Sequence, residues 1–419
     1  MAGERGERHQ FSARVLQSRS PSELARELGR TDSDPEGVGI MAQKSRIYAV
    51  RLDHVSLRAA PLLKQEALAV GADSAHARGI ADHSVSETSV VLLATWAQHR
   101  RLVEKLERQP FHLRTLGAEV EAALRAYTRH GARTVVGAHR ALVVGDRPRV
   151  MGVVNVTPDS FSDGGAFFDP DRAIAHGRAL IDEGADLLDI GGESTRPGAT
   201  PVDPEEEWRR IAPVVRALAD EGRVPISVDT RHAIVAQRAL EAGADMINDV
   251  SGLVDPDMRR VVRDGKAAAI VMHLRGDPAT MQQDTQYADL RGEVFSALAA
   301  RTDAAVRDGI PPDRILIDPG LGFGKTPEQS LELLAHSGEL RSLGYPVVIG
   351  ASRKSMLGWA LGAADPAARL EAGIAAAVIA AMDGIELIRT HDVAPTVRAL
   401  AVVARIADAA HARSEPPIR

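Results

Sequence analysis

The sequence predicts an α/β protein in which a (β/α)8 barrel of the TIM type follows a small α/β amino-terminal domain. The barrel is predicted from residues 132–410, where short apolar segments alternate with segments of helical periodicity. This alternation is typical of parallel strands joined by helices. The apolar segments show no alternation with polar residues, as expected of strands that are covered on both faces. Eight such units in a stretch of this length match the size of a TIM barrel.

The eight expected strands are short and are separated by helical segments. An open, doubly wound sheet is the structural alternative, because the same alternation of strands and helices also builds that fold. A hairpin at residues 134–144 is expected to precede the first strand. We expect the strands at residues 150–156, 187–192, 226–230, 246–250, 269–274, 315–320, 346–352 and 386–392.

Residues 1–131 form the expected amino-terminal domain, which begins with a polar arm. Ser20, Pro21 and Glu23 form the signature of a helix start, with serine as the N-cap and proline at the first helical position. No motif in this region carries chemistry, so its role is left open. Further along we expect strands at residues 46–52 and 88–95 and helices at 56–71, 102–109 and 116–131, the last ending on a glycine cap.

Composition excludes several classes of function for this chain of 419 residues. A net charge of -6 and 3% aromatic residues argue against a nucleic-acid partner and an anionic membrane surface. The absence of cysteine excludes disulfides, thiolate metal sites and cysteine nucleophiles. The amino terminus lacks the apolar segment of a signal peptide, and the longest apolar run, residues 373–382, is too short to cross a bilayer. We therefore expect a cytoplasmic enzyme.

Polar residues stand at the carboxyl ends of nearly all the expected strands. In a barrel these ends meet on one face, and barrel enzymes carry out their chemistry there. A single aspartate after a strand is more simply a helix cap, but the whole set favours an active site. The set comprises Asn155, Asp189, Glu193, Asp229, Asn248, His273, Asp318, Lys354, Arg389 and His391.

The residue types in this set indicate two kinds of ligand group. Asp229, Asn248 and Asp318 offer oxygen acceptors, which suit the N–H donors along the edge of a heterocycle. Arg389 and His391 are two residues apart on the last strand, so they point to the same side and can hold an anion. The end of the barrel near strands seven and eight commonly holds phosphate. The alternative for His391 is a buried structural histidine.

Two loops after the first and second strands are rich in Gly, Pro, Ser, Thr and Asp. These loops, residues 155–165 and 191–200, have the composition of lids that close over a substrate. Other motifs are excluded. The glycines of GLGFGK at residues 320–325 have neither dinucleotide-binding nor P-loop spacing, and no HExxH or GxSxG motif is present. The acidic run at residues 203–207 is interpreted as a capped helix start.

The segment from about residue 132 to 405 resembles dihydropteroate synthase. It has the family's motifs in the family's order: MGVVNVTPDSFSDGG, DIGGESTRPGA, SVDT, INDVSG, DPGLGFGK, GASRKSMLG and IRTHDV. Pterin-dependent methyltransferases share the barrel but lack the combination of TRPG, SRKS and RxHD. They are the alternative within the same fold. A non-enzymatic pterin-binding or assembly protein is a third hypothesis, in which residues 1–131 are the functional part.

The resemblance implies that 4-aminobenzoate displaces diphosphate from (7,8-dihydropterin-6-yl)methyl diphosphate, giving 7,8-dihydropteroate in folate synthesis. It also implies a dissociative mechanism, Mg²⁺ as cofactor, a homodimer with contacts on late barrel helices, and inhibition by sulfonamides. The implied pterin ligands are Asp229, Asn248, Asp318 and Lys354, with Met272 and Phe323 near the ring. Asn155 would contact Mg²⁺. The diphosphate would be contacted by Thr195, Arg389 and His391. The aminobenzoate site would be shaped by Phe161, Arg196, Pro197 and Ser355. The implied catalytic residues are Asn155, Lys354, Arg389 and His391.

Overall fold

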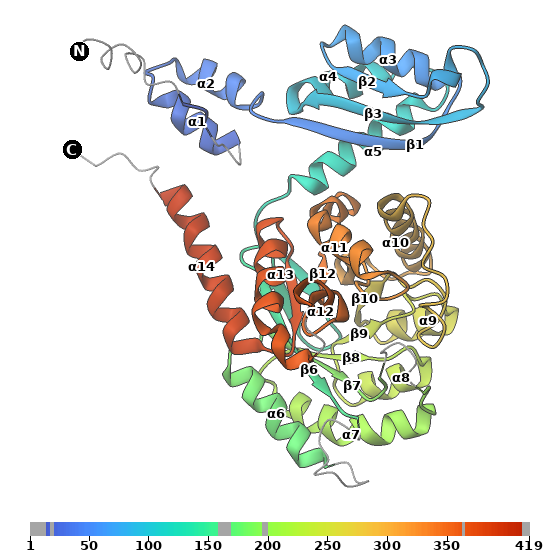
Figure 1. Ribbon diagram of the computed structural model, residues 1–419, viewed down its shortest axis with the longest axis vertical. Helices are drawn as coiled ribbons and strands as arrows, with labels where there is room; N and C mark the ends of the chain where they lie inside the picture. Colours follow the sequence, from blue (N-terminus) through green and yellow to red (C-terminus); the bar gives the residue numbers. More distant parts are fainter. Residues whose placement is uncertain (1–13, 17–20, 158–168, 195–199, 363–364, 413–419) are drawn as a thin grey trace. The chain divides into compact units, whose positions relative to one another are not determined.

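The computed structural model describes residues 14–16, 21–157, 169–194, 200–362 and 365–412 (Figure 1). The chain divides into two compact units, Met1–Ala122 with Ala407–Arg419 and Ala123–Ile406. The division falls inside helix α5 (Leu113–Tyr127). Among the described residues, no helix is both long and apolar enough to cross a membrane.

The first unit contains the small α/β domain that the sequence predicts. Its antiparallel sheet has the order β1-β3-β2, and alternate residues of β3, including Val90 and Leu92, are buried. Helix α2 and strand β2 were not expected, because each is too short to show a clear period. Helix α5 ends at Tyr127 rather than beside Gly131. The elements are α1 (Pro21–Gly29), α2 (Pro35–Ala42), β1 (Ile47–Ser56), α3 (Ala59–Ala69), β2 (Asp73–His76), η1 (Arg78–Ile80), β3 (Glu87–Thr95), α4 (Trp96–Leu106) and α5.

The second unit is the predicted barrel. Within the described residues its eight parallel strands follow the order β11-β10-β9-β8-β7-β6-β13-β12. Ile317 of β11 pairs in parallel with Val347, next to β12, and this bridge joins the two ends of the sheet. The open-sheet alternative is therefore wrong. The strands are β6 (Arg149–Asn155), β7 (Leu187–Gly191), β8 (Ile226–Asp229), β9 (Met246–Asp249), β10 (Ala268–Met272), β11 (Ile315–Asp318), β12 (Val348–Ile349) and β13 (Leu387–Thr390).

Strand β12 is shorter than the predicted 346–352. Pro346 has no backbone N–H for the ladder and Gly350 follows the strand, so only two residues pair regularly.

A hairpin of β4 (Arg133–Val136) and β5 (Ala141–Val144) closes the amino-terminal end of the barrel. Its residues Val135, Leu142 and Val144 are buried in one cluster with inward-facing strand residues such as Met151 and Leu387. Because apolar side chains fill this end, a ligand can enter only at the carboxyl ends of the strands.

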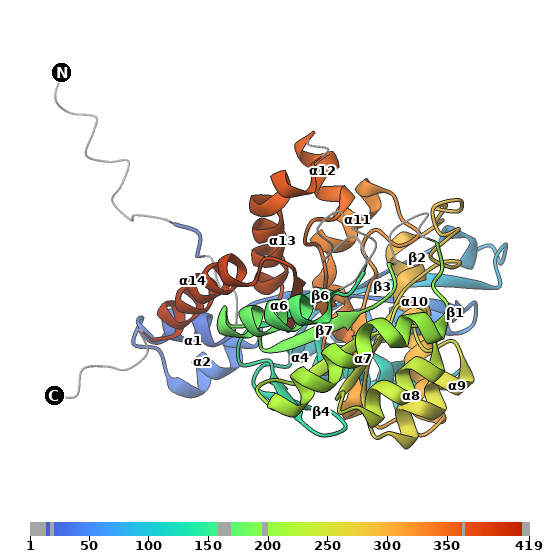
Figure 2. The same cartoon turned by 90° about the horizontal axis from the view of Figure 1, so that it is seen from below.

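Helices surround the strands, and helices consecutive in sequence are neighbours in space for α6 to α9 (Figure 2). Asp169, Asp203, Asp255 and Asp289 cap helix starts by accepting a backbone N–H bond. The predicted capped start at Asp203 is confirmed. The helices are α6 (Pro170–Asp182), α7 (Pro204–Glu221), α8 (Ala233–Glu241), α9 (Pro256–Asp264), α10 (Leu290–Arg307), η2 (Pro312–Arg314), α11 (Pro327–Ala335), η3 (Ser337–Leu343), α12 (Ser355–Leu361), η4 (Pro366–Arg369), α13 (Leu370–Met382) and α14 (Val393–Ala412).

Candidate active site

An ion cluster lies at the carboxyl end of the barrel, where β7, β8, β9 and β13 each contribute one side chain. Arg389 donates through Nε to Asp189 Oδ2 at 2.7 Å and through Nη2 to Asp229 Oδ2 at 3.0 Å. Asn248 Nδ2 donates to the same Asp189 oxygen at 3.0 Å. Residues separated by up to 200 positions in sequence thus share one hydrogen-bonded group.

With both carboxyl groups ionised, the cluster would hold more negative than positive charge, because one guanidinium serves two carboxylates. Burial, and next the charge of Asp189, raise the pKa of Asp229 to about 8, although Arg389 acts in the opposite direction. The Oδ1 atom of Asp189 is buried and has no hydrogen-bond partner among the described residues. A buried acceptor of this kind is costly unless it is satisfied. The cluster is therefore suited to a ligand that brings N–H donors.

A second pair of opposite charges stands beside this cluster. Asp318, the last residue of β11, accepts a hydrogen bond from the Gly320 backbone N–H at 2.6 Å. Lys354 precedes α12, and its Nζ donates to Leu321 O at 2.7 Å. Burial lowers the pKa of Lys354 to about 8 while Asp318 acts against the shift, and burial raises the pKa of Asp318. The two side chains add an acceptor and a donor to the same end of the barrel.

An apolar wall adjoins these polar groups. Met272, at the end of β10, is buried in a small cluster with Val250 and Met281, and Phe323 packs against it. The Lys354 ammonium lies 4.8 Å from the centre of the Phe323 ring. A flat heterocycle could contact this wall with its face while its edge meets the polar cluster.

His391 and Asn155 meet at the ends of the neighbouring strands β13 and β6. Asn155 Nδ2 lies 3.3 Å from His391 Nε2, which leaves the amide oxygen of Asn155 for a ligand. His391 Nδ1 lies 3.2 Å from Ser352 Oγ, and Ser352 Oγ donates to Asp392 at 3.4 Å. With Nδ1 as the donor to serine, Nε2 is the acceptor that faces Asn155. His391 is therefore a site residue rather than an isolated core histidine.

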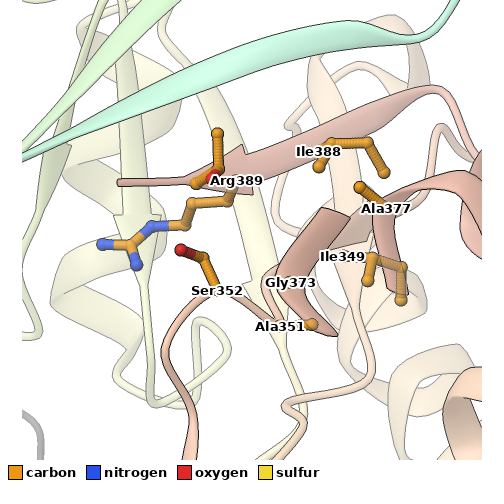
Figure 3. Close-up of a pocket in the computed structure, with 8 residues that line it drawn as sticks. Ile349, Ala351, Ser352, Gly373, Ala377, Ile388 and Arg389 are labelled. Carbon is orange, nitrogen blue, oxygen red and sulfur yellow. The ribbon is translucent and has the colours of Figure 1, made fainter. Parts of the chain in front are cut away.

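A small pocket behind Arg389 separates the site from helix α13. Figure 3 shows the Arg389 side chain extending past Ser352 and away from the apolar side chains of Ile349, Ala377 and Ile388. The apolar groups line the pocket on one side, and the charged end of Arg389 is directed to the other side, where it binds the carboxylates of β7 and β8.

The structure brings together most of the side chains that the sequence singles out. Ser355 begins α12 next to Lys354 and is exposed. Phe161, Thr195, Arg196 and Pro197 lie outside the described residues, so their predicted roles stay predictions. Asp189 lies in the predicted strand 187–192 and belonged to the candidate set, but it received no individual role from the sequence; its contacts place it at the centre of the cluster.

The acidic start of α7 is more than a capped helix end. Glu207 is fully buried and lies 2.7 Å from His232 Nδ1, while both oxygens of Glu193 accept bonds from Arg231. Among the described residues, Glu193, Glu207 and His232 form the one group whose ligand atoms lie close enough to hold a metal, within 4.8 Å of one another. Because Arg231 already neutralises one carboxylate, we interpret this group as an ion-pair network.

Residues 151–391 match the family described as pterin binding enzyme. The dihydropteroate synthase of Synechocystis sp. is 45% identical over 266 residues, which are 63% of this chain and 91% of that protein. The chain belongs to the dihydropteroate synthase family. Among solved structures, the Xanthomonas albilineans dihydropteroate synthase with 4-aminobenzoic acid superimposes with a TM-score of 0.63 at 45% sequence identity. The aligned region covers 68% of this chain and 100% of that chain. Membership favours the synthase over the pterin-dependent methyltransferase.

A longer match includes the amino-terminal unit. The probable bifunctional folylpolyglutamate synthase/dihydropteroate synthase of Halobacterium salinarum is 40% identical over 377 residues, or 90% of this chain. That match is too long to fit within Ala123–Ile406, so it extends into the first unit. The chain spans 45% of that archaeal protein, less than half of its length.

Proposed function

We propose that the protein is a dihydropteroate synthase, a transferase that joins (7,8-dihydropterin-6-yl)methyl diphosphate to 4-aminobenzoate and releases diphosphate. The observation that carries the proposal is the polar cluster of Asp189, Asp229 and Asn248 around Arg389, with Asp318 and Lys354 beside it. This cluster supplies acceptors and donors for a pterin edge next to the apolar wall of Met272 and Phe323. Residues 132–410 would form the catalytic domain, with residues 1–131 outside it.

The residues match the demands of this reaction. The nucleophile is a neutral aromatic amine, so it needs no strong base. The difficult step is the departure of diphosphate, whose developing charge Arg389 would stabilise, joined by His391 in its protonated form. The carboxylates and Asn248 would hold the pterin by its N–H groups while its ring delocalises the positive charge left on the methylene carbon. Exclusion of water from that carbon favours transfer to the amine over hydrolysis.

The direct test is an assay of diphosphate release with both substrates and Mg²⁺. We expect release to require 4-aminobenzoate, and we expect a sulfonamide to compete with 4-aminobenzoate rather than with the pterin. A parallel assay for methyl transfer to a corrinoid tests the methyltransferase alternative. Methyl transfer without diphosphate release would overturn the proposal.

Asn155 fits a role as a magnesium ligand. Its amide oxygen is a hard, neutral donor of the kind that Mg²⁺ accepts while keeping several waters and binding phosphate oxygens. Bound Mg²⁺ would neutralise charge on the diphosphate leaving group. His391 holds the amide nitrogen of Asn155 and so orients its oxygen.

Replacing Asn155 with alanine is expected to raise the Mg²⁺ concentration for half-maximal rate by about tenfold, because one protein ligand is lost. Titration of Mg²⁺ at saturating substrates measures this shift. Asn155→Ala at high Mg²⁺ should recover part of the rate. An unchanged Mg²⁺ titration would remove Asn155 from the metal site.

A homodimer is the proposed assembly, and late helices of the barrel support it. Large apolar side chains are exposed on α12, α13 and α14, although such residues are normally buried. They are Trp359, Ile379, Met382, Val402 and Ile406, each with about half of its side-chain surface exposed.

The proposed partners of the active site are its small-molecule substrates, without nucleic acid or membrane. The proposed location is the cytoplasm, which the cysteine-free composition fits.

Replacing Ile379 with glutamate is expected to shift the protein toward monomer, because a charge would be buried without a partner in the interface. Sedimentation velocity at several protein concentrations measures the change. Val254→Glu is the matched control, since Val254 is exposed on the loop before α9. Equal behaviour of the two variants would place the interface elsewhere.

A further inference from the structure

A buried lysine that the proposed mechanism does not use lies beside the pterin-binding side chains. Lys325 follows the glycine-rich segment between β11 and α11, and only 2% of its surface is exposed. Lysine is almost never fully buried unless its amino group has partners. The position of those partners indicates what the side chain does.

The Lys325 amino group joins two separate segments of the barrel rim. Its Nζ donates to Gly320 O at 3.0 Å and to Phe323 O at 2.9 Å, both within the glycine-rich segment. It also lies 2.9 Å from the His273 ring atom Nδ1 and 3.5 Å from His273 O, at the end of β10. One side chain therefore ties the segment after β11 to the segment after β10.

The glycine-rich segment follows an unusual backbone path that passes close to the end of β10. Gly320, Gly322 and Gly324 have φ angles of 66°, 80° and 63°, in the left-handed region that glycine favours. A Cβ on Gly320 would come within 2.0 Å of His273 O, so the two segments are in close backbone contact. This path brings the carbonyl oxygens of Gly320 and Phe323 to the same amino group of Lys325.

The same segment supplies two parts of the proposed pterin site. Leu321 O accepts the hydrogen bond from Lys354, and the Phe323 ring lies under the Lys354 ammonium. Phe323 also packs against the cluster that contains Met272, the last residue of β10. The relative position of Lys354, Phe323 and Met272 thus depends on the contact that Lys325 maintains.

We propose that Lys325 is a positioning residue for the pterin substrate, which holds the segment Gly320–Gly324 against the end of β10. This inference rests on the proposed function. His273 is the partner of Lys325. Burial, and to a smaller extent the charge of Lys325, lower the pKa of His273 to about 2. The imidazole is therefore neutral, and its Nδ1 can accept a hydrogen bond from the amino group. Lys325 acts through Phe323 and Lys354 and has no contact with the reacting atoms.

The experiment compares Lys325→Met with Lys266→Met, the matched control. Lys266 is exposed and lies before β10, at the opposite end of that strand. For Lys325→Met we expect the KM for the pterin diphosphate to rise by about tenfold or more, because misplacement of binding groups weakens a site steeply. The KM for 4-aminobenzoate should stay within about twofold of the wild-type value, since its proposed ligands lie on other loops.

Calorimetric titration with 6-hydroxymethylpterin separates this inference from the proposed function. Weaker pterin binding by Lys325→Met with unchanged far-UV dichroism supports the positioning role. Equal pterin affinity in Lys325→Met and wild type overturns it, as does a parallel rise of both KM values. If wild type binds the pterin but releases no diphosphate, the proposed function fails while the binding comparison still stands.

Two further variants keep the test valid if Lys325→Met does not fold. Lys325→Gln keeps a shorter donor group, and His273→Phe removes the ring acceptor while it retains the ring volume. If Lys325 positions the pterin, both should weaken 6-hydroxymethylpterin binding while the urea midpoint stays above that of Lys325→Met. Wild-type pterin affinity in both variants would overturn the proposal.

Discussion

Replacement of Arg389 by methionine is expected to reduce diphosphate release by about a thousandfold, the upper range for loss of a donor that stabilises a developing anion. Arg389 has two roles in the structure. It forms ion pairs with Asp189 and Asp229, and its position beside His391 suits it to the diphosphate. Methionine has a similar unbranched chain but no donor, so the variant removes the charge and keeps an apolar side chain at this position.

The same substitution should also destabilise the fold. Removal of one member of a buried ion pair costs about 3–5 kcal/mol, because the remaining charges lose their counter-ion. Urea denaturation measures this cost, and assays at low temperature separate it from the loss of turnover. Arg178→Met is the control, because Arg178 pairs with Glu221 on the surface at 2.7 Å. Turnover above a tenth of the wild-type rate in the Arg389 variant would contradict its assigned role.

At a pH above 8, where the Asp229 carboxyl is mostly ionised, its replacement by asparagine is expected to raise the KM for the pterin diphosphate by roughly ten- to a hundredfold, since a hydrogen bond to a charged group contributes about 1.5–3 kcal/mol. Asparagine keeps the shape of the side chain but presents one N–H group where the pterin needs an acceptor. Steady-state kinetics with varied pterin diphosphate measure the effect. Asp220→Asn, at an exposed position on α7, is the control. A pterin KM that matches this control would exclude Asp229 as a pterin ligand.

The same variant should change how stability depends on pH. The pKa of Asp229 rises from 3.8 to about 8 on folding, so the folded state binds more protons than the unfolded state between these values. Stability contributed by this group is therefore present at low pH and is lost as the pH rises toward 8. Asp229→Asn should flatten the decline in urea midpoint between pH 5 and pH 8. Parallel declines in both proteins would show that another group is responsible.

The site residues at the ends of strands could be predicted from the sequence, because the apolar segments mark the strands and all strands of a barrel end on the same face. Asn248, Asp318 and Arg389 each end an apolar segment, and parallel strands of a barrel place such ends together. The pairing among them could not be predicted, because 200 positions separate Asp189 from Arg389. Strand order and stagger decide which carboxylates share the guanidinium, and both arise only when the barrel closes.

Residues that act from loops and helices were harder to interpret. Lys325 stands in a motif that fits no phosphate-binding spacing, and nothing in that motif indicates that its amino group turns inward to three carbonyl groups. Glu207 belongs to an acidic run that is interpreted from the sequence only as a capped helix start, yet it is fully buried against His232. In both cases one partner is a histidine from a different βα unit, His273 for Lys325 and His232 for Glu207, so local pattern carries no signal for it.

By itself the sequence determined the class of fold, the expected positions of its strands and the residue types gathered at one end of the barrel. These depend on hydrophobic periodicity and turn residues, which act over short distances along the chain. The tertiary structure alone decided that the barrel closes through Ile317 and Val347, that Asp189 and Asp229 share Arg389, and that Lys325 donates to the carbonyl of Gly320 in the glycine-rich segment. Burial and the distances between charges set these properties, and neither exists until remote segments come together.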